Sequence, residues 1–264
     1  MKAFGMKSLS LAVLGLVGFG MASSASAVCP YPFNTAGGGA WSLQTTNNAT
    51  LAAASPGLEL VNPSACKMTA YINAGAGPLA TGAVIDQSPT NEASYHFRFY
   101  IDTASLASMP NLATVQVFAA NSAVNFPLSG NNQTLALMRL GLVGVGAVNP
   151  NLVAVSACNV PASNYRCLGQ VALTPGVHWI EGHLTFGAAA ITNIWVDKAS
   201  ITNDTTPAPD ITLGTYDNSE WGGVETVALG LGGTSPNFRS GFSGPAHTVG
   251  FDNFDSRRQT FIGQ

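Results

Sequence analysis

Charged side chains are scarce in this chain of 264 residues, of which only 9% are Asp, Glu, Lys or Arg. Its longest run of basic residues is the pair Arg257-Arg258. Because nucleic-acid binding needs a clustered basic face, this composition argues against nucleic acid as a partner. Solubility must then come from Asn, Thr, Ser and Gln, while many apolar, strand-like runs distinguish the chain from a disordered one.

The sequence also lacks a complete catalytic, nucleotide-binding or zinc-binding motif. Its four cysteines contain no Cys-x-x-Cys spacing, which structural zinc sites commonly use. The segment Ser240-Gly-Phe-Ser-Gly244 is typical of a loop and not of the strained elbow that carries a hydrolase serine. We therefore expect a protein that acts by binding, and not an enzyme.

No apolar run in the sequence is long enough to cross a bilayer. The run from Leu9 to Met21 has about thirteen residues, whereas a spanning helix needs roughly 20. It lies between two lysines and Ser24-Ala-Ser-Ala27, which is the layout of a secretory signal peptide. We expect residues 1–27 to be a signal peptide and residues 28–264 to be a single domain that is secreted or periplasmic, with no membrane span in the mature chain.

Cysteines are few, and in an oxidising compartment the four of them are expected to form two disulfides. Four cysteines allow three pairings. Their order along the chain suggests Cys29 with Cys66, and Cys158 with Cys167. The second pair would close a short hairpin loop, which stabilises a fold by roughly 3 kcal/mol.

Helical periodicity is nearly absent after residue 27, whereas short runs with a period of two recur between Gly, Pro, Asn and Ser clusters. The clearest is Tyr95–Ile101, in which one face carries Tyr95, Phe97, Phe99 and Ile101 and the other face carries His96, Arg98 and Tyr100. This pattern predicts an all-β protein, a two-sheet antiparallel β-sandwich of the jelly-roll kind. The segment Thr202–Asp217 contains two prolines and predicts a polar connection. The other predicted strands are Thr114–Ala119, Thr134–Leu142, Leu152–Ala157, Gln170–Leu173, Val177–Phe186, Ile191–Asp197, Glu225–Leu231 and Thr248–Phe254.

The final predicted strand changes parity part-way along. Val249 and Phe251 keep one parity, but Phe254 lies on the other, so a bulge near Asn253 would let all three face the core. Asp255 and Arg257 would then lie on the solvent side.

Several segments together resemble one known superfamily. Tyr95–Ile101 has the pattern of an early core strand, Gly176–Phe186 with Asn193–Lys198 that of a strand pair ending in a Trp-x-Asp turn, and Val227–Gly230 with Val249–Phe254 that of closing strands. They are similar to the concanavalin A-like lectin/glucanase superfamily, in the laminin-G-like sense, and the tail Ser256–Gly263 resembles that of uncharacterised bacterial secreted members. The resemblance implies a fold, and one fold hosts many functions.

Within the glucanase branch of that superfamily the catalytic motif is Glu-x-Asp-x-x-Glu. The segment Glu220–Glu225 keeps only the two outer glutamates, because Gly222 stands where the motif has Asp. Without the orienting carboxylate, hydrolysis is the weaker interpretation. A polar turn that leads into a strand explains the same residues.

Sugar sites use exposed aromatic rings together with hydrogen-bonding Asn, Asp and Arg side chains. We expect Trp221 to be the most exposed ring, and we predict a ligand site formed by Trp221, Glu220, Asp217 and Tyr216. An aromatic residue in a sandwich more often belongs to the core. The full set of aromatic candidates is Trp41, Trp179, Trp195, Trp221, Tyr100 and Tyr216.

Glu181 and His183 share a strand face with Trp179, where they could act as an acid–base couple or simply form the wet side of a sheet. Two clusters of oxygen ligands could hold calcium, which is the one cofactor that the sequence suggests. The predicted metal residues are Asp252, Asn253 and Asp255, with Asp217, Asn218 and Glu220 as the other cluster; turn chemistry accounts equally well for both.

These patterns predict an exported, disulfide-containing β-sandwich that acts as a non-catalytic binding module. The expected ligand is a carbohydrate or another polymer of the cell envelope. The alternatives are a structural or assembly protein of the cell surface, which would show an uncovered sheet edge or apolar patch, and a glycoside hydrolase.

Overall fold

The computed structural model describes residues 41–58, 66–128, 131–146, 149–158, 166–198 and 206–257, apart from the side chains of 123–136, 166 and 257. The expected signal peptide and Cys29 lie outside these ranges. Among the described residues, no helix is long and apolar enough to span a bilayer. The strands are β1 (Leu43–Asn47), β2 (Ala49–Ala54), β3 (Lys67–Ile72), β4 (Thr81–Asp86), β5 (Ser94–Asp102), β6 (Thr114–Leu128), β7 (Asn131–Val143), β8 (Asn151–Ala157), β9 (Arg166–Ala172), β10 (Val177–Thr185), β11 (Ala190–Val196), β12 (Ile211–Tyr216), β13 (Val224–Gly232) and β14 (Val249–Arg257).

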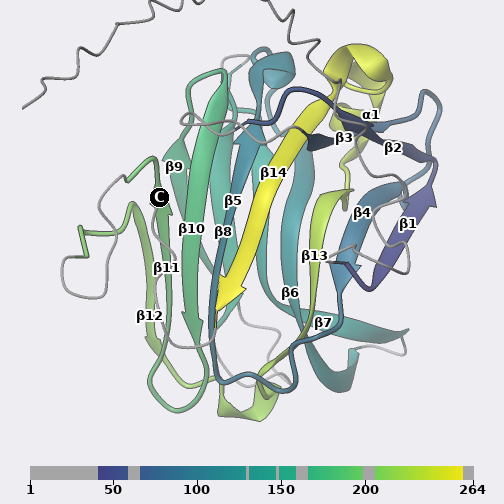
Figure 1. Ribbon diagram of the computed structural model, residues 1–264. Coiled ribbons are helices and arrows are strands. Elements are labelled where there is room, and N and C mark those ends of the chain that lie inside the picture. The colour runs from purple at the N-terminus through teal and green to yellow at the C-terminus, as the bar shows by residue number, and fades with distance from the viewer. Residues whose placement is uncertain are drawn as a thin grey trace, which may run out of the picture.

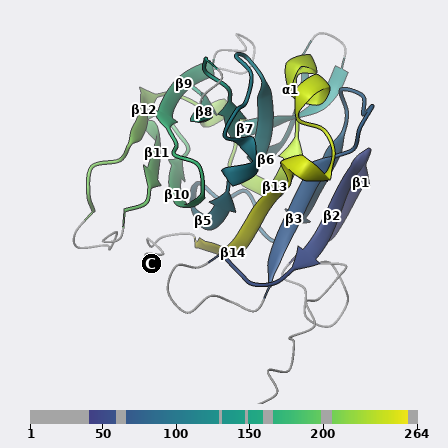
Figure 2. The ribbon, with the colours of Figure 1, turned by 90° about the horizontal axis from the view of Figure 1, so that it is seen from above.

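Two antiparallel sheets of seven strands make up the described structure, so the predicted β-sandwich is confirmed. The first sheet has the order β1-β4-β13-β6-β7-β8-β9 and the second the order β12-β11-β10-β5-β14-β3-β2. Seen from above, β10, β5 and β14 lie in one layer and β8, β7 and β6 in the other (Figures 1 and 2). The short helix α1 (Pro236–Gly241) begins after the N-cap Ser235, whose hydroxyl accepts a hydrogen bond from Phe238 N.

The core lies between the sheets and contains the face of β5 that the sequence predicts to be apolar. Tyr95, Phe97, Phe99 and Ile101 are all fully buried there. Phe97 packs flat against Phe118 of β6, with 4.1 Å between ring centroids. Gly182 of β10 lies under the Phe97 ring, where an added Cβ would come within 2.1 Å of the ring. A larger residue at position 182 would therefore push the aromatic stack out of place.

All nine predicted strands are present, but the interpretation of Thr202–Asp217 is wrong for its second half. Residues Ile211–Tyr216 form β12, which pairs with β11. The two apolar residues that alternate in this strand, Ile211 and Leu213, are buried against Gly169 of β9. Two alternating apolar residues after a proline-rich stretch were too weak a signal. The sequence pattern does not predict β1 to β4, because their alanines, threonines and glycines obscure the period of two.

The predicted bulge in β14 is confirmed. The pairing of β14 with β5 shifts register between Asp252 and Asp255, and Asn253 has a φ of 48°. Val249 and Phe251 are buried, and Phe254 packs against the same core. The extra residue places all three apolar side chains on the inner face.

The predicted bridge between Cys158 and Cys167 is confirmed, with 5.6 Å between the two Cα atoms. It ties the end of β8 to β9, the outermost strand of the first sheet. Cys66 is also disulfide-bonded. Because Cys29 lies outside the described residues, the pairing of Cys29 with Cys66 stays a prediction.

Candidate functional site

The four residues of the predicted ligand site do not form one accessible surface. Asp217 and Glu220 are exposed, whereas Trp221 is fully buried in the core, so the expected exposure of Trp221 is wrong. A 3-10 turn over Ser219–Trp221, followed by Gly222 with a φ of 67°, turns the indole inward. A ring of this size contributes more by burial than it could in a polar turn.

Tyr216 also has an interior partner. Its hydroxyl lies 2.9 Å from both Ser156 Oγ and Thr192 Oγ1, and those two hydroxyls are 3.0 Å apart. Ser156 belongs to the first sheet, while Thr192 and Tyr216 belong to the second. This triangle of hydroxyls joins the two layers and does not offer the Tyr216 oxygen to solvent.

Asp217 opens the turn that buries Trp221. Its Oδ1 accepts hydrogen bonds from the hydroxyl and the backbone N–H of Ser219, at 2.7 and 3.0 Å. These two bonds lower the pKa of Asp217 below its usual value. The side chain therefore already has a local structural role, as Asp side chains at turns commonly do.

The predicted metal residues lie at the β14 bulge. Asp252 accepts a hydrogen bond from Leu58 N at 2.7 Å through Oδ2 and from Asn253 N at 2.8 Å through Oδ1. Asp255 faces the strand position of Arg98. Within the described ranges, no group of three His, Cys, Asp or Glu side chains is arranged to hold a metal ion. Calcium binding here gains no support from this geometry and stays a prediction.

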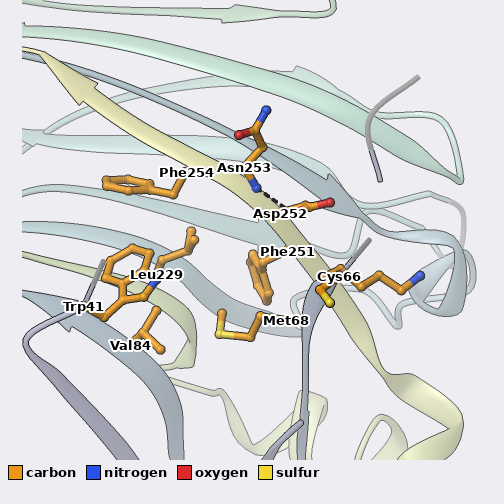
Figure 3. Close-up of a pocket in the computed structure, with 10 residues that line it drawn as sticks. Trp41, Cys66, Met68, Val84, Leu229, Phe251, Asp252, Asn253 and Phe254 are labelled. Atoms are coloured by element: carbon orange, nitrogen blue, oxygen red, sulfur yellow. Dashed lines mark hydrogen bonds between the residues drawn. The ribbon is translucent and has the colours of Figure 1, made fainter. Parts of the chain in front are cut away.

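An open cavity of about 180 Å³ lies beside the bulge, and we call it the bulge cavity. It forms where β3 stops pairing with β14, since that pairing covers only Val249–Phe251. The cavity walls are mainly apolar, and Figure 3 shows Phe251, Met68, Leu229 and Val84 gathered on one side of β14. The residues that line it are Trp41, Cys66, Lys67, Met68, Val84, Leu229, Phe251, Asp252, Asn253 and Phe254.

Trp41 gives the bulge cavity an accessible aromatic wall. Of the four tryptophans in the chain it is the only one that is not buried. Its ring lies 4.8 Å from that of Phe254, at an angle of 40°. Polar groups stand at the mouth, where Lys67 begins β3 and the exposed Asn253 occupies the bulge. The combination of aromatic walls with a few polar groups is typical of small-ligand sites.

A second cluster, the histidine face, lies on the outer side of the second sheet and consists of His96, Arg98, Glu181, His183 and Asn193. Strand register sets its layout. Asn193, His183 and His96 form one row across β11, β10 and β5, and Trp195, Glu181 and Arg98 form the next. Paired residues of this kind have Cβ atoms roughly 5 Å apart.

The two histidines of this face are stacked, with ring centroids 3.9 Å apart and planes 12° from parallel. Burial and the neighbouring His183 lower the pKa of His96 to about 4. Burial also lowers the pKa of His183. Both imidazoles are therefore neutral at neutral pH, which is the form that accepts a proton.

Much of this outer side is covered. Glu181 is fully buried and His96 is 3% exposed, while Arg98, His183 and Asn193 are half-buried. Next to the histidine face, Tyr100, Trp179 and Trp195 form a small apolar cluster with Leu58. These rings are buried, so they are not sugar platforms, contrary to the role considered for them. Pro207 also covers the edge, because its carbonyl accepts a hydrogen bond from Trp195 Nε1 at 2.8 Å.

His178, the other histidine of β10, has a structural role. Its Nδ1 donates to Asp197 Oδ2 at 2.8 Å and its Nε2 donates to the Thr174 carbonyl at 2.6 Å. The hydrogen bond to Asp197 is the main reason that the pKa of His178 is raised, even though burial opposes it. Asp197 also accepts from Trp179 N. The Asp of the Trp-x-Asp turn seen in the sequence thus fixes the first residues of β10 through hydrogen bonds.

No family model matches the sequence, and no curated protein matches it significantly. Solved structures do match. An endo-β-1,4-glucuronan lyase from the fungus Trichoderma reesei aligns with a TM-score of 0.59 and 10% identity, over 82% of this chain and 90% of that one. The cellulose-induced protein Cip1 aligns with a TM-score of 0.48 and 16% identity, over 83% and 89% of the two chains. The alginate lyase Aly36B, in a complex with alginate trisaccharide, gives 0.47 and 10%, over 73% and 81%.

The fold is a concanavalin A-like β-sandwich. The resemblance carried by the sequence segments is therefore confirmed at the level of architecture. Identities this low compare folds and not sites. Trp41 is among the aromatic candidates from the sequence, but its position beside Phe254 and Lys67 depends on the fold, since the three come from distant parts of the chain.

Proposed function

We propose that the protein is an exported glycan-binding module and that the bulge cavity receives a sugar ring. The observation that carries the proposal is the half-buried Trp41 at the wall of an open cavity. Its ring and that of Phe254 provide apolar faces for the CH groups of a pyranose. Lys67 and Asn253 at the mouth supply hydrogen-bond donors for hydroxyl or carboxylate groups. The shared architecture with a glucuronan lyase supports glycans as the first ligand class to test.

The test is a glycan array followed by calorimetric titration of the best ligand, with and without a calcium chelator. We expect Trp41→Ala to weaken binding at least about fivefold, because one stacked ring is worth on the order of 1–3 kcal/mol. Trp41→Phe should retain most of the affinity. Tyr71→Ala, which changes a half-buried aromatic of β3 that does not line the cavity, is the matched control. If Trp41→Ala leaves the affinity of the ligand unchanged, the ligand binds at a different site.

A fluorescence measurement gives a second readout that does not depend on a particular glycan library. Because the other three tryptophans are buried, a collisional quencher should reach Trp41 first. Ligand binding should protect this fluorescence, and Trp41→Phe should remove the quenchable fraction. Quenching that stays unchanged at saturating ligand would contradict a sugar in the bulge cavity.

The histidine face favours one second candidate, a lyase that acts on an acidic polysaccharide. Two neutral imidazoles lie next to a row that contains Arg98. In a β-elimination, a neutral base removes the proton next to a carboxylate, and a cation stabilises the charge that develops. A double bond then forms as the bond from the β-carbon to the glycosidic oxygen breaks, and that oxygen takes up a proton from the protonated base or from water. The half-buried His183 and Arg98 are the members that a substrate could reach.

The lyase candidate is tested by incubating the protein with polyglucuronate and alginate and following the ultraviolet absorbance of the unsaturated product. We expect turnover to be lost in His183→Gln and in Arg98→Lys, while Trp41→Ala should affect substrate binding more than the chemical step. Absence of product from every polyuronate rejects the lyase and leaves the binding module intact.

A further inference from the structure

A hollow in the outer face of the first sheet lies over Gly141 of β7. Gly141 pairs with Gln116 of β6 and with Val153 of β8. The three atoms nearest to a Cβ added at Gly141 would be backbone atoms, the closest of them the carbonyl oxygen of Val115 at 3.3 Å. The side chains of the neighbouring strands thus leave this position open, and the glycine forms the floor of a groove of about 310 Å³.

The groove has an apolar wall and a polar side. Val153 and Val155 of β8 line the wall together with Leu168 of the edge strand β9, which is 63% exposed. Gln116 of β6 lies on the other side of the floor, and Arg139 precedes the floor by two residues in β7, on the same strand face. Arg139 pairs with Val155, which pairs with Leu168, so the apolar wall begins directly beside the cation.

Arg139 is an unpaired cation. Among the described residues, no hydrogen bond or ion pair involves its guanidinium, and the described residues that line the groove include no Asp or Glu. Partial burial lowers the pKa of Arg139, but a guanidinium stays charged at neutral pH. Its planar fork of N–H groups matches the two oxygens of a carboxylate. Charge complementarity therefore favours an anion, and the shape of the fork favours a carboxylate.

The size of the groove suits a small molecule with an apolar chain. Its volume lies near the lower end of the ~300–1,000 Å³ that small-ligand sites enclose. Two strand spacings of about 4.8 Å separate β7 from β9, so a chain of roughly 10 Å reaches from Arg139 to Leu168. A sugar bound here would leave hydroxyl groups against Val153, Val155 and Leu168 without hydrogen-bond partners, which is costly. The wall therefore favours methylene groups.

We propose that this groove, which we call the Arg139 groove, is a second ligand site that binds a small carboxylate with an aliphatic chain. The carboxylate lies at Arg139, where the Gln116 amide also offers a hydrogen-bond donor, and the chain lies along Val153, Val155 and Leu168. The groove shares no residue with the bulge cavity. The proposal is therefore independent of glycan binding, and each site can be tested while the other stays intact.

The first test compares four ligands that differ in charge or in chain length, by calorimetric titration of the mature chain, residues 28–264. The ligands are octanoate, octan-1-ol, octylamine and acetate, each below the concentration at which it aggregates. We expect octanoate to bind at one site per chain, and the other three to bind at least about tenfold more weakly, because each lacks the negative charge or the chain. In amide NMR spectra, octanoate should shift the signals of Gly141 and Val153 and leave that of Asn253 at the bulge unchanged.

Two pairs of variants then separate the cation from the apolar wall. Arg139→Gln should weaken octanoate binding at least about fivefold but leave octan-1-ol binding unchanged, which also shows that the groove is intact. Lys67→Gln, which removes the same charge at the bulge cavity, is its control and should not affect octanoate. Leu168→Ser should weaken octanoate and octan-1-ol alike, whereas Leu79→Ser changes a leucine that is 78% exposed outside the groove and should affect neither.

Three outcomes overturn the proposal. One is the absence of saturable octanoate binding to the wild type. Another is an affinity for octanoate that Arg139→Gln leaves unchanged or that Lys67→Gln lowers as much. The third is binding to vesicles of an anionic phospholipid without binding of free octanoate, because the face would then be a membrane-contacting surface and not a ligand groove. Glycan binding should be the same in Arg139→Gln as in the wild type, so the failure of either proposal is distinguishable from that of the other.

Discussion

The outer faces of the two sheets differ more than the sheets themselves do. The second sheet carries two histidines, an arginine, a glutamate and two tryptophans on its outer side, and most of these side chains are buried. In the first sheet, two rows of paired outer positions across β13, β6, β7, β8 and β9 contain alanine, glycine, valine, leucine and glutamine, with Arg139 as their only ionisable residue. In a chain with only 9% charged residues, this division shows where polar groups are used. They build a covered polar layer on one sheet and leave these outer positions of the other sheet almost uncharged.

The largest expected difference between the two faces concerns stability. Trp179→Ala would open a cavity in the small cluster with Tyr100, Trp195 and Leu58, and should lower the free energy of unfolding by about 3–5 kcal/mol. Val155→Ala on the first sheet removes two methyl groups from a half-buried position and should cost about 1 kcal/mol or less. Urea denaturation of both variants measures the contrast. Equal losses would mean that the second sheet's outer cluster is not a true second core.

Two histidines of the second sheet, His96 and His178, should affect stability with opposite pH dependence. His96 has a lowered folded pKa, about 4, so the unfolded chain binds its proton first as pH falls below about 6.5. Burial of neutral His96 therefore lowers the stability of the folded protein as pH falls from about 6.5 to about 4, by on the order of 3 kcal/mol. His96→Gln should remove this part of the acid sensitivity.

His178 should show the opposite trend. Because its folded pKa is raised, its stabilising effect is fully present below about 6.5 and is lost as pH rises through the folded pKa. The stability gap between wild type and His178→Gln should therefore shrink as pH increases. Thermal unfolding at a series of pH values measures both variants, and parallel curves for the two would contradict the assignment of one buried neutral and one paired cationic histidine.

The smallest predicted effect concerns the link between the sheets. Tyr216→Phe removes one corner of the hydroxyl triangle with Ser156 and Thr192 and should cost about 1 kcal/mol, since the remaining two hydroxyls still bond to each other. Glycan binding should not change, in contrast to the role that the sequence suggested for Tyr216. A loss of affinity without a loss of stability would restore that role.

The parts of the fold that could be predicted are those where side chains obey a strict period. Alternation in Tyr95–Ile101 and the change of parity before Phe254 indicated both a core strand and a bulge, and the order of the cysteines along the chain suggested the bridge between Cys158 and Cys167. Strand β12 was missed because only Ile211 and Leu213 mark its inner face. Hydrophobic periodicity is a property of a single strand, so it predicts best those strands that have several alternating apolar residues.

The candidate sites were harder to predict because strands that are distant in sequence form them. A turn-like sequence around Trp221 suggested exposure, but burial of the indole depends on a core that no local pattern describes. The bulge cavity depends on where β3 ends relative to β14, which is a property of pairing. The sequence predicts only part of the histidine face. Glu181, His183 and Trp179 share one face of a predicted strand, but their register with Arg98 depends on how the strands pair in the sheet.

The bulge at Asn253 also determines where β14 can vary in length. Deleting Asn253 would restore plain alternation and leave Phe254 on the inner face with Val249 and Phe251, whereas deleting Gly250 would place Val249 and Phe251 on opposite faces. Loops of the sandwich can gain or lose residues at little cost. Strand β14 can lose a residue at the bulge, but it cannot lose Gly250 without turning an apolar side chain out of the core, so deletions in this strand among relatives should occur at the bulge.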